Sequence, residues 1–535
     1  HFGSQCSFAV SLVPLLCVVE ILVPLPFLAA TMMWILALVL QLGASHAFPK
    51  GCLPQITPPA TPPRLATSYN GIALEDVCFD NQTDDDALHF FAISDWGGIP
   101  YGGGPPVPAD LAARSLVKGV DMQAQQRVAA QMAERAKINQ PRFVLNAGDM
   151  FYWNGLETHC GLGMTTLSDP KEQFSKVFEQ VYIGEELKSV PWLGTLGNHD
   201  FGGRAYTSGW DQIIAFTWGP SGRWVTPALY WRQRVHHLDF TADFFFVDSN
   251  VNDVSAPGTH KFANLCGANA SYHPNISTAM SNSMLTCGEQ GPTSPSDCVS
   301  WFHALWKDQV AWLEKELYDS TGAADWQIVV THFPPEGNWQ LDTWKHLSAS
   351  YGIDLFVTGH RHQQEVHVPG TKNPLGTTYV VSGGGGGIMS EKKPSADGHD
   401  DQYGFFDIAI TRHTLNLSAI SHGGILRSTT VVEPRVGMLT QTSTSTTTTS
   451  STMTSTTTSS TSMTTSTTAT STETVTSTTT SSSTVTLTTV TRTRTTMTRT
   501  TSTATRTTST MKLPISNSDP EGIPIILLLL LASSL

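Results

Sequence analysis

Positive charge is scarce in this 535-residue sequence, which has 31 Lys and Arg residues against 44 Asp and Glu residues and a formal net charge of -13. A general nucleic-acid binder would carry a basic stripe, so this balance argues against nucleic acid as a partner. It does not exclude a phosphate-bearing small molecule, because bound metal ions can supply local positive charge. The cysteines form no CxxC pair and no zinc-like spacing, so no structural zinc site is predicted.

Cysteine is sparse, but its number is informative. The cysteines that follow the apolar N-terminal region are Cys52, Cys78, Cys160, Cys266, Cys287 and Cys298. An even number behind such a region predicts disulfides, for which 15 pairings exist, and we expect Cys52 and Cys78 to strap the segment between them. Asn-X-Ser/Thr sequons stand at Asn81, Asn269, Asn275 and Asn416. Together these features predict a glycoprotein that folds in the oxidising secretory route.

The N-terminal region has the features of a signal peptide. No charged residue appears from Ile21 to Ala44. Met32 and Met33 precede an apolar run, Trp34–Leu42, and the small residues near Ala47 resemble a cleavage site. The basic residues that usually begin such a peptide are missing, so an uncleaved anchor is the alternative.

The C-terminal region is different again. Residues 440–510 are almost entirely Thr and Ser, which bury too little apolar surface to fold, so we expect a disordered, O-glycosylated stalk. The uncharged run Ile523–Leu535 is shorter than the roughly 20 residues of a membrane span. Small residues at 516–518 resemble a GPI-anchor signal. The tail therefore predicts membrane attachment at the cell surface, with a merely apolar terminus as the alternative. A secreted, lysosomal or vacuolar location of the protein is also compatible with the sequence.

Short apolar runs alternate with longer periodic ones between residues 88 and 435, which predicts an α/β layered fold. Strands are predicted at Leu88–Ser94, Arg142–Ala147, Trp192–Leu196, Phe244–Val247, Ile328–Val330, Leu355–Val357 and Tyr379–Val381. Helices are predicted at Asp121–Lys137, Pro170–Tyr182 and Ala304–Tyr318. Residues 250–300 have little periodicity and are interpreted as a surface insertion. The predicted segments are a leader (1–47), a lead-in (48–87), a catalytic domain (88–435), the stalk (436–512) and an apolar tail (513–535).

Five polar motifs each follow a predicted strand. They are Asp95-Trp96-Gly97-Gly98, Gly148-Asp149-Met150-Phe151-Tyr152, Gly197-Asn198-His199-Asp200, His332, and Gly359-His360-Arg361-His362. Ligands of open α/β sheets bind beyond the carboxyl ends of strands, so we expect the motifs to converge on one edge of the sheet. Carboxylates and a phenolate favour a hard ion such as Fe(III), whereas imidazole and amide groups suit Zn(II), Fe(II) or Mn(II).

Two such ions about 3.5–4 Å apart could clamp a phosphoryl group and activate a water molecule. Asp149 could bridge both ions, since a carboxylate has two oxygens, and His199 could orient the phosphate or protonate the leaving group. Taken singly, these residues are also typical of turns, helix caps and core histidines; the order and context of the five motifs favour a site. The run Gly383–Gly387 is interpreted as a flexible loop, with an approach to phosphate as the alternative.

The motif order DWGG, GDxxY, GNHD, VxxH (Val329 to His332) and GHxH resembles that of the purple acid phosphatases, within the calcineurin-like metallophosphoesterase superfamily, over roughly residues 88–420. The flanking residues are most similar to those of the small, tartrate-resistant animal-type enzymes. The resemblance implies a four-layer αββα sandwich of two mixed sheets flanked by helices. It also implies an acid phosphatase that hydrolyses small-molecule phosphomonoesters.

The resemblance further implies a binuclear centre of Fe(III) and a divalent Fe, Zn or Mn ion. By that resemblance, the ferric ion would be held by Asp95, Asp149, Tyr152 and His362. The divalent ion would be held by Asp149, Asn198, His332 and His360. His199 would be the catalytic histidine, acting beside Asp149. Tyr152 is the ligand that separates this family from the wider two-metal phosphoesterases.

One departure from the family pattern concerns proton transfer. The family often carries a second histidine a few residues after the VxxH histidine, but residues 333–340 contain none, and Glu336 is their only acidic residue. The group that protonates the leaving alcohol therefore stays open. Two other functions are also compatible with the sequence: a neutral phosphoesterase or diesterase with a different metal pair, and a non-catalytic surface glycoprotein displayed on the stalk. The oligomeric state is not determined.

Overall fold

The computed structural model describes residues 51–80, 87–98 and 115–435, apart from 166, 168, 258, 260–263, 268–285 and 337–339, and the backbone of 470–481 and 484–495. The chain divides into two units, His1–Ser445 and Thr446–Leu535. The predicted leader, the apolar tail and the sequons at Asn81, Asn269 and Asn275 lie outside the described residues. Within the part of the chain that is described, no helix is both long and apolar enough to cross a bilayer.

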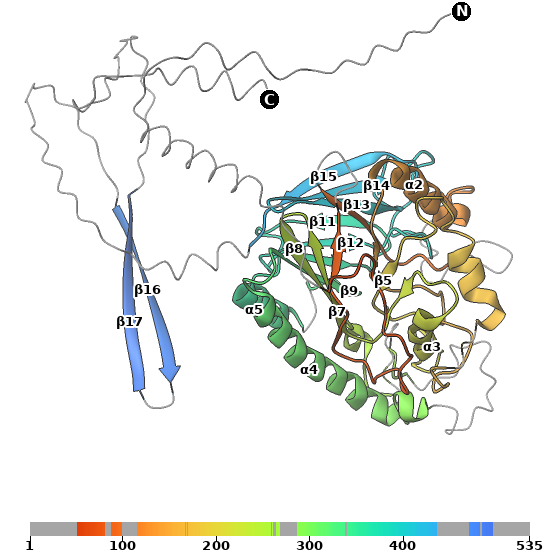
Figure 1. Ribbon diagram of the computed structural model, residues 1–535, viewed down its shortest axis with the longest axis horizontal. Coiled ribbons are helices and arrows are strands. Elements are labelled where there is room, and N and C mark those ends of the chain that lie inside the picture. Colours follow the sequence, from red (N-terminus) through yellow and green to blue (C-terminus); the bar gives the residue numbers. More distant parts are fainter. Residues whose placement is uncertain are drawn as a thin grey trace, which may run out of the picture. The chain divides into compact units, whose positions relative to one another are not determined.

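Two mixed β-sheets form the centre of the first unit (Figure 1). The first sheet has the order β1-β7-β8-β9-β10-β12-β11, with β2 paired to β7. Its strands are β1 (Ile72–Ala73), β2 (Val77–Phe79), β7 (Trp231–His237), β8 (Phe240–Val247), β9 (Trp326–Thr331), β10 (Leu355–Thr358), β11 (Gln364–His367) and β12 (Thr378–Ser382). The second sheet has the order β15-β14-β13-β3-β4-β5-β6. Its strands are β3 (Leu88–Ile93), β4 (Val144–Asn146), β5 (Trp192–Gly194), β6 (Trp224–Val225), β13 (Gly404–Ile410), β14 (Leu415–Ser421) and β15 (Leu426–Val432).

The strand β3 shows why the sheets must be covered on both faces. All of its residues are buried. Successive side chains of a strand point to opposite faces, and accordingly Phe90 belongs to one hydrophobic cluster while Phe91 belongs to another. The Phe90 ring stacks on Phe143 at 4.9 Å and meets Phe244 of the other sheet edge-on at 5.5 Å. The core between the sheets is therefore apolar, and the outer face of β3 needs a further layer.

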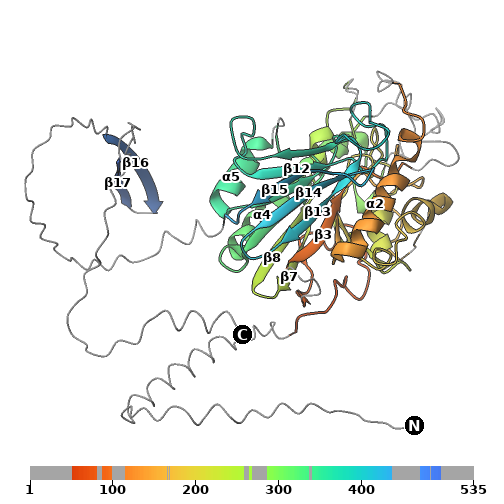
Figure 2. The same cartoon turned by 90° about the horizontal axis from the view of Figure 1, so that it is seen from above.

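Helices supply the outer layers (Figures 1 and 2). The helix α2 (Ala124–Asn139) packs on β13 and β14 of the second sheet, and α4 (Pro295–Ser320) packs on β8 of the first and on α5 (Leu341–Tyr351). A short helix, α3 (Trp210–Ala215), lies in the segment after β5. The arrangement confirms the predicted α/β fold with two mixed sheets flanked by helices.

Every predicted strand is present, and two of the predicted helices are. The helix expected from Asp121 begins with a 3₁₀ turn and continues as α2. The helix expected from Ala304 belongs to α4, which already starts at Pro295, where the Ser294 hydroxyl accepts a hydrogen bond from the Asp297 backbone N–H (3.1 Å). Such an N-cap satisfies one of the free N–H groups of the first turn.

The third predicted helix, Pro170–Tyr182, is wrong as a continuous α-helix. A 3₁₀ turn at Pro170–Glu172 precedes a π-helical turn at Ser175–Glu179. Lys171 has a φ of 53°, which interrupts the helical backbone. Tertiary packing competes with helical propensity here, because the Phe174 ring stacks on Phe216 at 3.6 Å.

Three disulfides resolve the pairing that the sequence left open. Cys52 pairs with Cys78 as expected, Cys160 with Cys287, and Cys266 with Cys298. All cysteines of the last two bridges are buried. The interpretation of residues 250–300 as a surface insertion stays a prediction; in their described part, buried half-cystines alternate with partly or fully exposed residues. Three disulfides indicate folding in an oxidising compartment, such as the secretory pathway.

The second unit contains a strand pair within the predicted stalk. Strands β16 (Thr470–Ser481) and β17 (Thr484–Thr495) pair in antiparallel register. Threonine is β-branched and favours extended backbone, although an isolated two-stranded ribbon is only marginally stable in water. The rest of the predicted stalk lies outside the described residues.

Candidate metal centre

The five motifs lie at the carboxyl ends of strands from both sheets. Asp95, the motif of Asp149 and the motif of Asn198 follow the parallel neighbours β3, β4 and β5 of the second sheet. His332 and the motif of His360 follow the parallel neighbours β9 and β10 of the first sheet. We expected the motifs to converge on one edge of a single sheet, and this is corrected. The site is assembled from two sheets, because both present the carboxyl ends of parallel strands on the same side.

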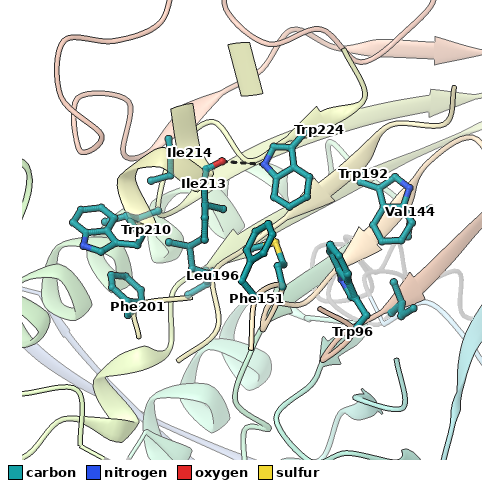
Figure 3. Close-up of a cluster of buried hydrophobic side chains, with 14 of the residues drawn as sticks. Trp96, Val144, Phe151, Trp192, Leu196, Phe201, Trp210, Ile213, Ile214 and Trp224 are labelled. Atoms are coloured by element: carbon teal, nitrogen blue, oxygen red, sulfur yellow. Dashed lines mark hydrogen bonds between the residues drawn. The ribbon is translucent and has the colours of Figure 1, made fainter. Parts of the chain in front are cut away.

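Aromatic side chains anchor the loops that carry the motifs (Figure 3). Trp96 follows Asp95 directly and is buried, and its indole N–H donates to the Asn146 side-chain oxygen at the end of β4 (3.0 Å). Phe151 precedes Tyr152 and belongs to the same buried cluster. The motif residues therefore cannot shift without disturbing a packed aromatic core, which fixes the loops rigidly.

Three motif residues adopt a left-handed backbone that is uncommon for any residue except glycine. Asp95 has a φ of 59°, Asp149 of 53° and His360 of 70°. Such conformations cost on the order of 1–3 kcal/mol each and persist where the surrounding structure enforces them. Their coincidence with three predicted ligands indicates that the fold orients these side chains at some cost in stability.

Tyr152 joins the two carboxylates. Its hydroxyl oxygen lies 2.8 Å from Asp95 Oδ1 and 2.8 Å from Asp149 Oδ2. Both carboxylates are almost completely buried, at 1 % and 0 % exposed. Three oxygen ligands predicted for one hard ion thus meet at one point.

Asn198 and two histidines complete the other side of the site. The His332 ring places Nδ1 at 2.8 Å from the Ala147 carbonyl oxygen and Nε2 at 3.0 Å from Asn198 Oδ1. The same Nε2 lies 3.4 Å from Asp149 Oδ2. His360 Nδ1 lies 3.3 Å from Asn198 Oδ1. The residues predicted for the divalent ion are therefore adjacent, with Asp149 between them and the first group.

His362 and His199 border this cluster. His362 Nε2 lies 3.6 Å from Asp95 Oδ1. The His199 backbone N–H donates to Asp149 Oδ1 (2.8 Å), and its Nδ1 lies 2.5 Å from the Trp153 carbonyl oxygen. A carbonyl can only accept, so Nδ1 carries the proton and Nε2 is left for a substrate. All of the predicted site residues are thus brought together.

Burial and charge shift the acidic groups strongly. Burial raises the pKa of Asp95 to about 7, opposed by the charge of His332 and assisted by that of Asp149. Burial also acts to raise the pKa of Asp149, but the charges of His332 and His199 outweigh it and hold this pKa below its usual value. Burial, followed by the charges of Asp149 and Asp95, raises the pKa of the Tyr152 phenol well above its usual value.

The pKa values of the histidines are shifted in opposite directions. Burial acts to lower the pKa of His332, but the Asp149 carboxylate outweighs it and raises the pKa to about 10. Burial, assisted by the charge of His332, lowers the pKa of His360 well below its usual value. Burial also lowers the pKa of His362, to about 3. Neutral imidazole is the form that binds metal, so His360 and His362 are already in that form.

The donor set fits a metal centre. Ligand atoms of Asp95, Asp149 and His332 all lie within 4.8 Å of one another. Two buried carboxylates and a phenol lie beside a buried histidine, and a buried charge is costly unless it is paired or coordinated. A bound cation would supply the missing positive charge and would favour ionised Asp95 and Tyr152.

Two residues that support the site were not predicted from the sequence. The Asp200 carboxylate is fully buried and accepts backbone N–H bonds from Met150 (2.8 Å), Phe151 (3.2 Å) and Gly197 (2.8 Å), so it ties the second motif to the third. Glu391 Oε1 accepts from the His362 backbone N–H at 3.2 Å. Asp200 was visible as the last residue of GNHD, whereas no sequence signal marked Glu391.

The glycine run is packed against the site, so its interpretation as a flexible loop is wrong. Residues 383–387 are buried, and the Gly387 N–H donates to the Asp95 carbonyl oxygen (2.7 Å). A Cβ on Gly387 would lie only 2.5 Å from Tyr152 Cε2. Glycine is thus required there because the ring of Tyr152 occupies the space.

Comparisons with known proteins place the chain in a family. The family model described as calcineurin-like phosphoesterase matches residues 88–364. Human tartrate-resistant acid phosphatase type 5 is 25% identical over 319 residues, covering 57% of this chain and 75% of the human protein. Purple acid phosphatase 3 of Arabidopsis thaliana is 27% identical over 307 residues, covering 55% of this chain and 69% of that protein.

Solved structures that the comparison matched include purple acid phosphatase PPD1 from yellow lupin (Lupinus luteus), with a TM-score of 0.34 and 13% identity, covering 69% of this chain and 55% of that chain. They also include GAP50, the anchor in the inner membrane complex of Plasmodium, with a TM-score of 0.41 and 17% identity, covering 65% of this chain and 89% of that chain.

Proposed function

Because the chain belongs to the calcineurin-like phosphoesterase family, and its motifs resemble those of the purple acid phosphatases, we propose that it is an acid phosphatase. It hydrolyses small-molecule phosphate monoesters at a binuclear Fe(III)–M(II) centre, where M is Fe, Zn or Mn. The observation that carries the proposal is the Tyr152 hydroxyl, 2.8 Å from each of the carboxylates of Asp95 and Asp149. A phenolate in that position is a hard ligand and favours a ferric ion.

The residues present would divide between the two ions as the resemblance implies. The ferric ion would be held by Asp95, Asp149, Tyr152 and His362, and the divalent ion by Asp149, Asn198, His332 and His360. When bound, the two ions supply Lewis-acid activation of water and neutralise charge on the phosphoryl group. Asp149 fits the bridging position because its Oδ2 lies 2.8 Å from the Tyr152 hydroxyl and 3.4 Å from His332 Nε2.

His199 is the proton-transfer or phosphate-orienting residue in this proposal. Its Nδ1 is fixed by the Trp153 carbonyl oxygen and its backbone N–H by Asp149. The remaining nitrogen, Nε2, is the atom that would contact the phosphate or the leaving oxygen. Burial lowers the pKa of His199, although the Asp149 charge opposes this, so donation of a proton to the leaving group requires acid conditions or a bound anion.

The test is hydrolysis of a chromogenic phosphomonoester by the full chain, from acid to neutral pH. The Asp149→Asn variant is expected to lose at least roughly 100-fold of the activity, since even the outer partners of metal ligands are worth 10–100-fold. The matched control is Asp342→Asn, at an exposed position in the first turn of α5. Wild-type activity no higher than that of Asp149→Asn would refute the proposal.

Colour and metal content separate the other candidate functions. A purple absorption band that disappears in Tyr152→Phe supports Fe(III) bound to the phenolate. A colourless but active protein favours the neutral phosphoesterase or diesterase with another metal pair. Purified protein without bound metal favours a non-catalytic surface glycoprotein.

We also propose that the enzyme acts outside the cell or at its surface. The disulfides support a secretory route. Attachment through the apolar tail stays a prediction, and release of the protein by a GPI-specific phospholipase would test it.

A further inference from the structure

An arginine stands between two of the predicted metal ligands and contacts two carboxylates at once. Arg361, flanked by His360 and His362, donates from Nη1 to Glu336 Oε1 (3.0 Å). On its other edge it donates from Nε and Nη2 to the two carboxylate oxygens of Glu365 (3.0 and 2.6 Å). The second contact is a bidentate fork, the geometry that distinguishes Arg from Lys.

The two carboxylates belong to different parts of the site. Glu336 lies in the loop after β9, which begins with His332, whereas Glu365 lies on β11, just after the loop that carries His360. The side chains of Arg361, Glu336 and Glu365 are 30 %, 24 % and 16 % exposed. Solvent therefore screens these pairs less than fully exposed ones.

Glu365 is anchored independently of the arginine. Its Oε2 lies 2.5 Å from His367 Nε2, and its Oε1 accepts from the Gln363 amide at 2.6 Å. The His367 ring in turn stacks on Tyr379 of β12 at 4.3 Å. The fork therefore fixes Arg361 to the first sheet. The Glu336 contact reaches from there to the loop of His332 and adds to the backbone hydrogen bond from the Gly359 N–H to the His332 carbonyl oxygen (2.9 Å).

We propose that Arg361 is a positioning residue for the metal centre. By holding Glu336 and Glu365 together, it fixes the loop of His332 against the loop of His360 and His362. The separation of the three imidazoles is then set before a metal binds, and loss of the cross-loop contact lets a bound ion escape faster. The inference rests on the proposed metal centre but not on the proposed substrate.

The test uses the full chain loaded with Zn²⁺, mixed with excess chelator, and follows the rate at which Zn²⁺ is lost. We expect Glu336→Gln, which keeps the shape but removes the charge, to lose Zn²⁺ about 3–10-fold faster than wild type, while the Tm of the metal-free protein is unchanged. Arg361→Lys keeps the charge but cannot span both carboxylates, and we expect a similar acceleration. The control, Glu134→Gln, removes an exposed ion pair with Lys137 on α2, and we expect no change in the rate.

The outcomes separate this inference from its alternatives. A wild-type rate of Zn²⁺ loss in Glu336→Gln would overturn it. A lower Tm in the metal-free Glu336→Gln protein would also overturn it, because the ion pair would then be holding the fold and not the ligand spacing. If wild type holds no Zn²⁺, the inference and the metal centre fail together. If wild type holds Zn²⁺ but hydrolyses no phosphomonoester, the proposed function fails, and a faster loss of Zn²⁺ from Glu336→Gln still supports the inference.

Discussion

The close packing of Gly387 against Tyr152 gives a sharp test of how the site is built. A Cβ at residue 387 would lie 2.5 Å from Tyr152 Cε2 and 2.7 Å from the Asp95 carbonyl oxygen. Ordinary carbon contacts lie at about 3.5–4.0 Å, so in Gly387→Ala the ring must move by roughly 1 Å. Overpacking of this kind costs about 1–3 kcal/mol of unfolding free energy.

The activity of Gly387→Ala should fall further than its stability suggests. Movement of the ring draws the phenol away from the carboxylates of Asp95 and Asp149, and a displacement of about 1 Å at a reacting centre can cost roughly 100-fold in rate. The assays are urea unfolding and hydrolysis of a chromogenic phosphomonoester. Gly370→Ala is the matched control, because a Cβ there would meet nothing within 4 Å. If Gly387→Ala matched Gly370→Ala in both assays, the packing argument would be refuted.

Two further predictions concern stability. Replacing Cys160 and Cys287 by Ala removes a bridge that spans 127 residues and should lower the free energy of unfolding by about 2–5 kcal/mol in urea titrations; an unchanged value would contradict this. Burial raises the pKa of the Asp211 carboxyl from 3.8 to about 7. The folded state therefore binds the Asp211 proton more tightly than the unfolded state does, and the free energy of unfolding that this residue contributes falls as the pH rises from 3.8 to about 7. Asp211→Asn should lack this decline, and parallel stability–pH profiles of variant and wild type would count against it.

The sequence was sufficient wherever the signal is local. Strand β3 was predictable because it is an apolar run that ends at a turn-forming Asp95, and the same pattern precedes Asp149, Asn198, His332 and His360. The residue types, in that order and directly after predicted strands, predicted metal ligands and led to the family. The segment Pro170–Tyr182 was not predictable in the same way: Lys171 interrupts its helical backbone, and Phe174 stacks on Phe216, 42 positions away along the chain.

Tertiary structure alone decided how these local pieces meet. Asp95 Oδ2 accepts a hydrogen bond from the His360 N–H, 265 positions away, and such a contact leaves no trace in a local pattern. The division of the ligands between two sheets, the pairing of Cys160 with Cys287 and the role of Gly387 have the same physical origin: each is set by long-range packing. The sequence by itself therefore predicted which residues form the site, and only the fold decided which of them touch and which neighbours, such as Arg361 and Asp200, lie beside them.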